Sequence, residues 1–139
     1  MVSLAQLLVV LHVVANVVWI GALASIGLVL TAGHGSSRDR GAIAVRLYRW
    51  LATPAFLVSL GMGLWRLLGA LDFYFVQTKF MHGKLLAAVG VIALHHVLGS
   101  LAKRMASGRA QAAPHATQLV IAMLFCAAAT IYFAVGKPF

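Results

Sequence analysis

Four long apolar stretches dominate this chain and leave few folds open to it. They cover approximately residues 4–32, 48–70, 80–101 and 117–136. Each reaches the length of about 20 mostly apolar residues that a helix needs to cross a hydrocarbon core of about 30 Å. The short alternating segments typical of a membrane β-barrel are not found. The sequence therefore predicts an all-α fold, an integral membrane four-helix bundle that forms a single domain over residues 1–139.

Composition excludes most classes of soluble protein. Of the 139 residues, 63% are hydrophobic and 9% are charged, whereas soluble domains carry about 25% charged residues. Eleven basic residues against two acidic ones give a net charge of +9, which in a soluble chain would indicate nucleic-acid binding. Because polar surface is scarce, we expect contact with the lipid bilayer and no nucleic-acid partner. The single cysteine, Cys126, excludes an internal disulfide and a multi-cysteine metal site.

The basic residues predict the orientation of the helices. Seven of the eleven lie in or beside the first and third connections: Arg38, Arg40, Arg46, Arg49, Lys103, Arg104 and Arg109. The other four are Arg66, Lys79, Lys84 and Lys137. Cytoplasmic loops of membrane proteins are enriched in Lys and Arg. We therefore expect these two connections to be cytoplasmic and both termini to be outside (N-out/C-out).

Ionisable residues inside the apolar stretches are candidates for a functional site, because they are costly to place in a membrane. His12, Asn16 and Trp19 share one stripe of the first helix at about 100° per residue, and we take this stripe as its inner face. His82 and Lys84 lie near the start of the third helix, at a matching depth. The predicted outer cluster consists of His12, Asn16, Arg66, His82 and Lys84.

A second, inner cluster is expected nearer the cytoplasmic side. It consists of His34, His95 and His96. On the third helix, Lys84 and His95 share one edge, and His82 and His96 lie on roughly the opposite edge. His95 lies about 20 Å deeper than His82. We expect structural or interfacial roles for His34 and His96.

The outer cluster suits a metal-containing cofactor. A b-type haem needs one or two axial ligands and an apolar slot between helices, and His12 and His82 offer imidazoles from separate helices. Arg66 or Lys79 would hold the propionates by charge-assisted hydrogen bonds. Copper is the alternative, since imidazole and thioether groups are suitable ligands for it. The five methionines are scattered along the sequence, so haem b fits better.

Small residues predict where helices pack closely. They recur at helical spacing as Gly83, Ala87 and Gly90 in the third stretch and as Ala122, Cys126 and Ala129 in the fourth. Such faces allow close helix–helix contact in membranes. A homodimer through the fourth helix is therefore one expected assembly.

Several short motifs occur in a characteristic order. They are Leu11-His12 followed by Trp19, Thr53-Pro54-Ala55, Gly61-Met62-Gly63-Leu64-Trp65, His82-Gly83-Lys84-Leu85, His95 and Lys137-Pro138-Phe139. In this order and spacing the chain resembles the HemJ-type protoporphyrinogen IX oxidases, four-helix membrane proteins related to the CopD copper-resistance family. The resemblance covers nearly the whole chain.

The resemblance implies a haem b protein of the bacterial inner membrane that oxidises protoporphyrinogen IX to protoporphyrin IX and passes electrons to quinone. It implies that His12 and a group on the third helix, such as His82, ligate the haem. It also implies that His95 belongs to the cofactor site and that Lys84 is catalytic.

The chain departs from the family pattern at several positions. Ile26-Gly27-Leu28-Val29 stands where the family has Leu-Pro-Arg-Leu. Family glutamates in the second helix and before the fourth helix have no match. Since porphyrinogen oxidation removes protons as well as electrons, lost carboxylates matter for the chemistry. Two alternatives therefore stay open: a haem-binding electron-transfer module without substrate chemistry, and a CopD-like copper-binding or transport protein.

Overall fold

The computed structural model describes residues 3–77 and 80–136, and its architecture is helical. Four spans are long and apolar enough to cross a membrane. They are α1 (Leu4–Thr31), the run of α2 (Ser37–Leu47), η1 (Tyr48–Ala52) and α3 (Thr53–Leu68), α4 (Phe80–Ala106), and α5 (Ala116–Gly136). A short helix, η2 (Phe73–Gln77), follows α3. The predicted all-α four-helix bundle is confirmed, and the protein is a multi-pass membrane protein.

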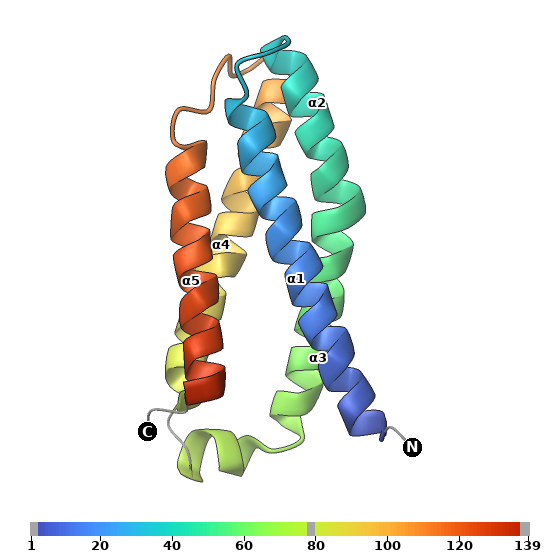
Figure 1. The fold of residues 1–139 in the computed structure, drawn as a ribbon, viewed down its shortest axis with the longest axis vertical. Helices are drawn as coiled ribbons and strands as arrows, with labels where there is room; N and C mark the ends of the chain where they lie inside the picture. Colours follow the sequence, from blue (N-terminus) through green and yellow to red (C-terminus); the bar gives the residue numbers. More distant parts are fainter. Residues whose placement is uncertain (1–2, 78–79, 137–139) are drawn as a thin grey trace.

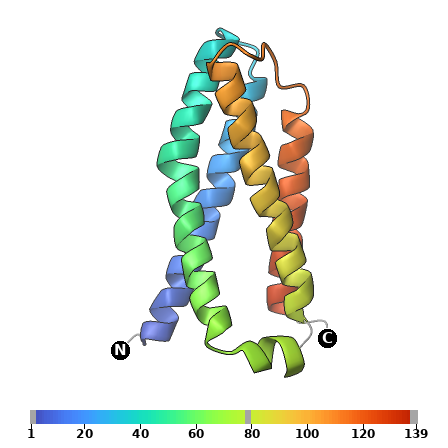
Figure 2. The same cartoon turned by 180° about the vertical axis from the view of Figure 1, so that it is seen from behind.

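The four spans run alternately up and down, so both termini lie at one end of the bundle (Figure 1). We call this the terminus end, and we call the opposite end, with residues 32–36 and 107–115, the loop end. Helix α1 packs against α3, α4 packs against α5, and α2 packs against α4 near the loop end. Toward the terminus end the α1–α3 pair and the α4–α5 pair diverge, and the segment that contains η2 joins them (Figure 2).

The second span begins at Ser37, earlier than the expected residue 48. Ser36 caps α2 by accepting a hydrogen bond from the Asp39 backbone N–H at 3.1 Å, and its hydroxyl donates to the Asp39 carboxylate at 2.6 Å. Arg40 donates to the carbonyl oxygen of Ala32 just after α1. The polar segment 37–47 is therefore a helical extension of the apolar stretch rather than a loop.

The third span also exceeds its expected end at residue 101 and continues to Ala106. Lys103 and Arg104 lie in its last turn. Both are good helix formers, and their positive charges are favourable near a helix C-terminus. The hydropathy boundary thus marks where the chain becomes polar, not where the helix stops.

A single π-helical turn, η1, interrupts the second span. Pro54 has no backbone N–H and cannot donate to the carbonyl four residues earlier. The N–H of Thr53 instead donates to the carbonyl of Tyr48, five residues earlier. The turn presents the Tyr48 ring to Gly99 of α4, where a Cβ would overlap the ring.

The core lies between α1, the second span and α4. Its largest fully buried side chains are Leu23, Ile26, Leu30, His95, Leu98, Met105 and Met123. Gly41 of α2 lies against the backbone of Met105 and Ala106, and a Cβ there would overlap these atoms. The outward faces expose large apolar side chains such as Leu28, Leu86 and Phe125. In a membrane these faces contact lipid.

Candidate functional site

His12 lies on α1, half-buried against α3. Its Nδ1 is 2.9 Å from the carbonyl oxygen of Ser59. Because a carbonyl oxygen can only accept, Nδ1 carries the hydrogen, and the neutral ring keeps its lone pair on Nε2. Gly63 gives the ring its space, since a Cβ there would lie 3.2 Å from His12 Cε1. A histidine held in this way can ligate a metal through Nε2.

Groups from three helices surround His12. Asn16 donates from Nδ2 to the backbone oxygen of His12 at 2.8 Å, so it acts on the helix backbone and not on the ring. The positive charges of Lys84 on α4 and Arg66 on α3 both act on the His12 ring. Lys84 is half-buried and Arg66 is exposed. Within the predicted outer cluster, Asn16 is thus joined to His12 by a hydrogen bond, whereas Lys84 and Arg66 act on it by charge alone.

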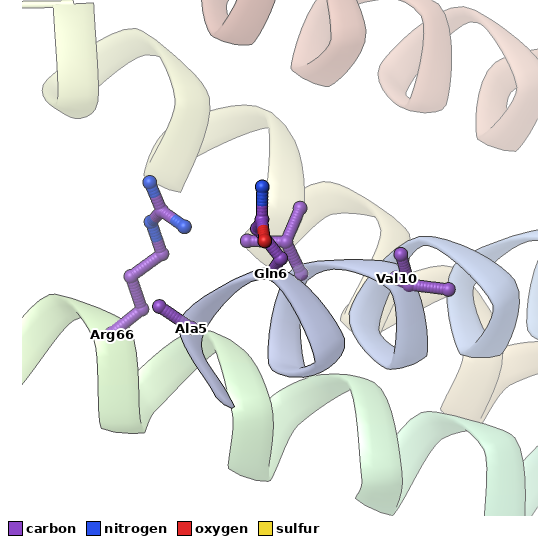
Figure 3. A pocket seen from close by; sticks show the side chains of 5 residues that line it. Ala5, Gln6, Val10 and Arg66 are labelled. Atoms are coloured by element: carbon purple, nitrogen blue, oxygen red, sulfur yellow. The ribbon is translucent and has the colours of Figure 1, made fainter. Parts of the chain in front are cut away.

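An open pocket of about 630 Å³ lies at the terminus end beside this group. It is lined by Ala5, Gln6, Val9, Val10 and Arg66. Figure 3 shows the Gln6 side chain rising from α1 and that of Arg66 rising from α3 on the same side. Arg66 Nε donates to the hydroxyl of Tyr74 at 3.0 Å, which steadies the guanidinium at the rim. The pocket is a shallow, open depression, and of the predicted outer cluster only Arg66 lines it.

His82, the fifth member of the predicted outer cluster, lies in the first turn of α4 and is exposed. Its ring meets the ring of Phe75 edge-on, with centroids 5.4 Å apart. His82 thus shares the terminus end with His12 but lies on a different helix. Lys79, the other predicted propionate partner, lies outside the described residues, as does Lys137.

His95 is 1% exposed and lies in an aromatic core. Trp19 Nε1 donates to His95 Nδ1 at 3.2 Å. The Tyr48 ring stacks on the imidazole with centroids 4.7 Å apart, and the Phe56 ring lies tilted against it with centroids 4.9 Å apart. Since the indole nitrogen can only donate, the neutral imidazole carries its hydrogen on Nε2 and has no free lone pair for a metal. This geometry favours a packing role for His95 over ligation.

The two predicted edges of α4 differ in burial. Lys84 is half-buried and His95 is buried, whereas His82 and His96 are exposed. The His96 ring lies 5.0 Å from that of His95. His34 is exposed in the turn after α1. The edge with Lys84 and His95 therefore faces the bundle.

Several residues that shape the site were not identified from the sequence. They are Tyr48, Phe56, Ser59 and Tyr74, while Gly63 was noted only as part of the Gly61–Trp65 motif and without a role. Tyr48, Ala52, Phe56 and Ser59 are buried and Gly63 is partly buried. The residues from Tyr48 to Gly63 recur every three or four positions and so share one face of the second span. This helical spacing is the sequence signal that could have identified the face.

Comparison of the chain with protein-family models, curated proteins and solved structures finds no match. The terminus end combines an imidazole with a fixed tautomer, two cationic side chains and a pocket. These features define the candidate site.

Proposed function

We propose that the protein binds haem b at the terminus end, with His12 Nε2 as one axial ligand. The observation that carries this proposal is the hydrogen bond from His12 Nδ1 to the Ser59 carbonyl. Metal-ligating histidines almost always donate their other ring N–H to a carbonyl, a carboxylate or water. His82 is the proposed second ligand on the resemblance alone, since it lies on the exposed edge of α4 and its ring contacts Phe75.

The donor set favours haem over copper. Within residues 3–77 and 80–136 there is no group of three or more His, Cys, Asp or Glu side chains suited to a metal ion. Haem needs only one or two ligands from the protein, because the macrocycle supplies the other four. Copper bound by His12, His82 and a methionine is the competing hypothesis.

The pocket walls support the same proposal. Ala5, Val9 and Val10 offer apolar surface to a macrocycle, and Gln6 adds a polar group. Arg66 at the rim and Lys84 nearby would hold carboxylates by charge-assisted hydrogen bonds. A tetrapyrrole has an apolar macrocycle, which would lie against the apolar wall, and two propionates, which would meet the cationic side chains.

We further propose a HemJ-like activity, the oxidation of protoporphyrinogen IX to protoporphyrin IX with electrons passed to quinone. Haem, when bound, supplies one-electron transfer. Arg66 would orient a carboxylate of the porphyrin. Lys84 would move a proton, since it is the titratable side chain on the inward edge of α4 at this depth. A haem-binding electron-transfer module without substrate chemistry is the alternative, favoured by the shortage of carboxylates.

Orientation, location and assembly are also proposed. Seven of the eleven basic residues belong to the loop end, so we propose that this end is cytoplasmic and that both termini are outside. The resemblance to HemJ supports a bacterial inner membrane. The exposed α5, which buries only Ala116 and Met123 within one copy, is the proposed surface for a homodimer.

The absorption spectrum of the purified chain tests haem binding. We expect a Soret band and α/β bands, their loss in His12→Ala, and their retention in His115→Ala, whose histidine lies exposed at the loop end. His95→Gln, which can still accept from Trp19, is expected to keep the bands. A colourless protein with stoichiometric copper would support the competing hypothesis. Rescue of a strain that lacks protoporphyrinogen oxidase distinguishes an enzyme from an electron carrier.

A further inference from the structure

Positive charge is concentrated at the loop end on two neighbouring helices. Six basic side chains there are exposed: Arg38, Arg46, Arg49, Lys103, Arg104 and Arg109. Helices α2 and α4 carry most of them and touch along the Gly41 backbone contact. Asp39 is the only acidic residue at this end, and its carboxylate accepts a hydrogen bond from Ser36. The surface is therefore strongly cationic.

One stripe of the second span combines this charge with apolar groups. Ile43, Arg46 and Trp50 follow one another at helical spacing, and all three are exposed. Trp50 is 82% exposed, although it lies within a span apolar enough to cross a membrane. Tryptophans are enriched at the headgroup level of membrane proteins. Arg46 is one helical turn from Trp50, on the side of the loop end.

Two further cations lie at about the same level. Arg49 directly precedes Trp50 and is exposed. Lys103 of α4 lies over the ring of Tyr48, with its Nζ 5.4 Å from the ring centroid. Guanidinium groups bind phosphate oxygens in a bidentate manner. A tryptophan beside two arginines thus provides both an interfacial anchor and phosphate-binding groups.

We propose that Arg46, Arg49 and Trp50 form a binding site for the headgroup of an anionic phospholipid. The phosphate would accept hydrogen bonds from the two guanidinium groups, and the indole would lie against the glycerol region. Charge complementarity and the exposed indole beside the two arginines, on a span apolar enough to cross a membrane, favour a lipid as the occupant. This inference is independent of the haem proposal, because it concerns the opposite end of the bundle.

Fluorescence quenching of Trp50 tests the proposal in the full chain. Trp65→Phe leaves Trp50 as the only lipid-exposed tryptophan, since Trp19 is 6% exposed. This variant is reconstituted in phosphatidylcholine vesicles that contain an equal mole fraction of brominated phosphatidylglycerol or brominated phosphatidylcholine. We expect the brominated anionic lipid to quench Trp50 more effectively, by about fivefold. Arg46→Gln/Arg49→Gln should bring the two lipids to equal quenching.

The controls separate a headgroup site from general attraction to charge. Arg38→Gln removes one charge from the far end of α2 and should keep the preference. Arg46→Lys/Arg49→Lys keeps both charges but loses the planar guanidinium groups, so it should lose part of the preference, and a fully retained preference would indicate general attraction to charge. Equal quenching by the two lipids before any arginine is changed would overturn the proposal. So would an unchanged preference in the double glutamine variant, or loss of the preference in excess inorganic phosphate, which would indicate a site for free anions.

Discussion

Trp19 Nε1 donates a hydrogen bond to His95 Nδ1 over 3.2 Å and so joins α1 to α4 inside an apolar core. In His12 the same ring nitrogen has the opposite role, because Nδ1 donates a hydrogen bond to the Ser59 carbonyl instead of accepting one. The neutral imidazoles therefore differ at Nε2, which carries a lone pair in His12 and a hydrogen in His95. Two histidines that look alike in the sequence thus have different chemical capacities.

Trp19→Phe should destabilise the bundle, because it leaves buried His95 Nδ1 without a donor. An unsatisfied buried acceptor costs about 1–3 kcal/mol. Unfolding in mixed micelles, followed by circular dichroism as the fraction of SDS rises, measures the change. Trp65→Phe is the matched control, since Trp65 is 72% exposed, and it should shift the free energy of unfolding by less than about 0.5 kcal/mol. Equal shifts in the two variants would contradict the importance of the Trp19–His95 bond.

Gly63→Ala should weaken haem binding, because its Cβ would lie 3.2 Å from His12 Cε1 and displace the ring. Disturbing the groups that hold a metal-ligating histidine typically lowers affinity by about 10- to 100-fold, and we expect the lower part of this range. The measurement is haem content per chain after titration of the apoprotein. Gly61→Ala is the control, because a Cβ at Gly61 meets nothing within 4 Å. If both variants bind haem as the parent does, Gly63 does not position His12.

Gly41→Ala should be strongly destabilising, because the added Cβ would overlap the backbone of Met105 and Ala106. Overpacking costs about 1–3 kcal/mol, and more where backbone has to move. Gly21→Ala meets nothing within 4 Å, and the higher helix propensity of alanine makes it neutral or stabilising. SDS titration of the two variants compares them directly. A Gly41→Ala protein as stable as Gly21→Ala would show that α2 and α4 do not pack this closely.

Arg66→Gln should speed the loss of haem, because it removes the cation at the pocket rim. Charge-assisted hydrogen bonds contribute about 1.5–3 kcal/mol, and the exposure of Arg66 reduces this, so we expect about a tenfold faster transfer of haem to excess apomyoglobin. Tyr74→Phe removes only the hydrogen bond to Arg66 Nε and should have a smaller effect. Arg109→Gln at the loop end controls for net charge, and a matching rate in that variant would exclude a role for Arg66.

Hydropathy and charge predict the number of spans and the grouping of His12, Lys84 and Arg66 at one end. These properties depend on local sequence, since a hydrophobic run has to match the thickness of the bilayer. The limits of the second and third spans were wrong for a related reason. Residues 37–47 and 102–106 carry the charged side chains that end the apolar stretches, but they continue a helix that has already formed, and helix propagation adds one hydrogen bond per residue.

Features that depend on distant contacts could not be predicted. Periodicity placed Lys84 and His95 on one edge of α4, but only packing against Tyr48 and Phe56 shows that this edge faces inward. The tautomer of His12 depends on a carbonyl 47 residues away. A carbonyl is present at every residue, so no side-chain pattern identifies the one that His12 meets.

The open form of the pocket between α1 and α3 at the terminus end has a consequence for how a ligand reaches it. The pocket beside Val9, Val10 and Arg66 is open, and exposed apolar side chains of α1 surround it. The proposed haem would therefore reach it by lateral diffusion within the bilayer, without first dissolving in water. Its occupancy would follow the concentration of the ligand in the membrane, so partitioning into lipid would contribute to the apparent affinity.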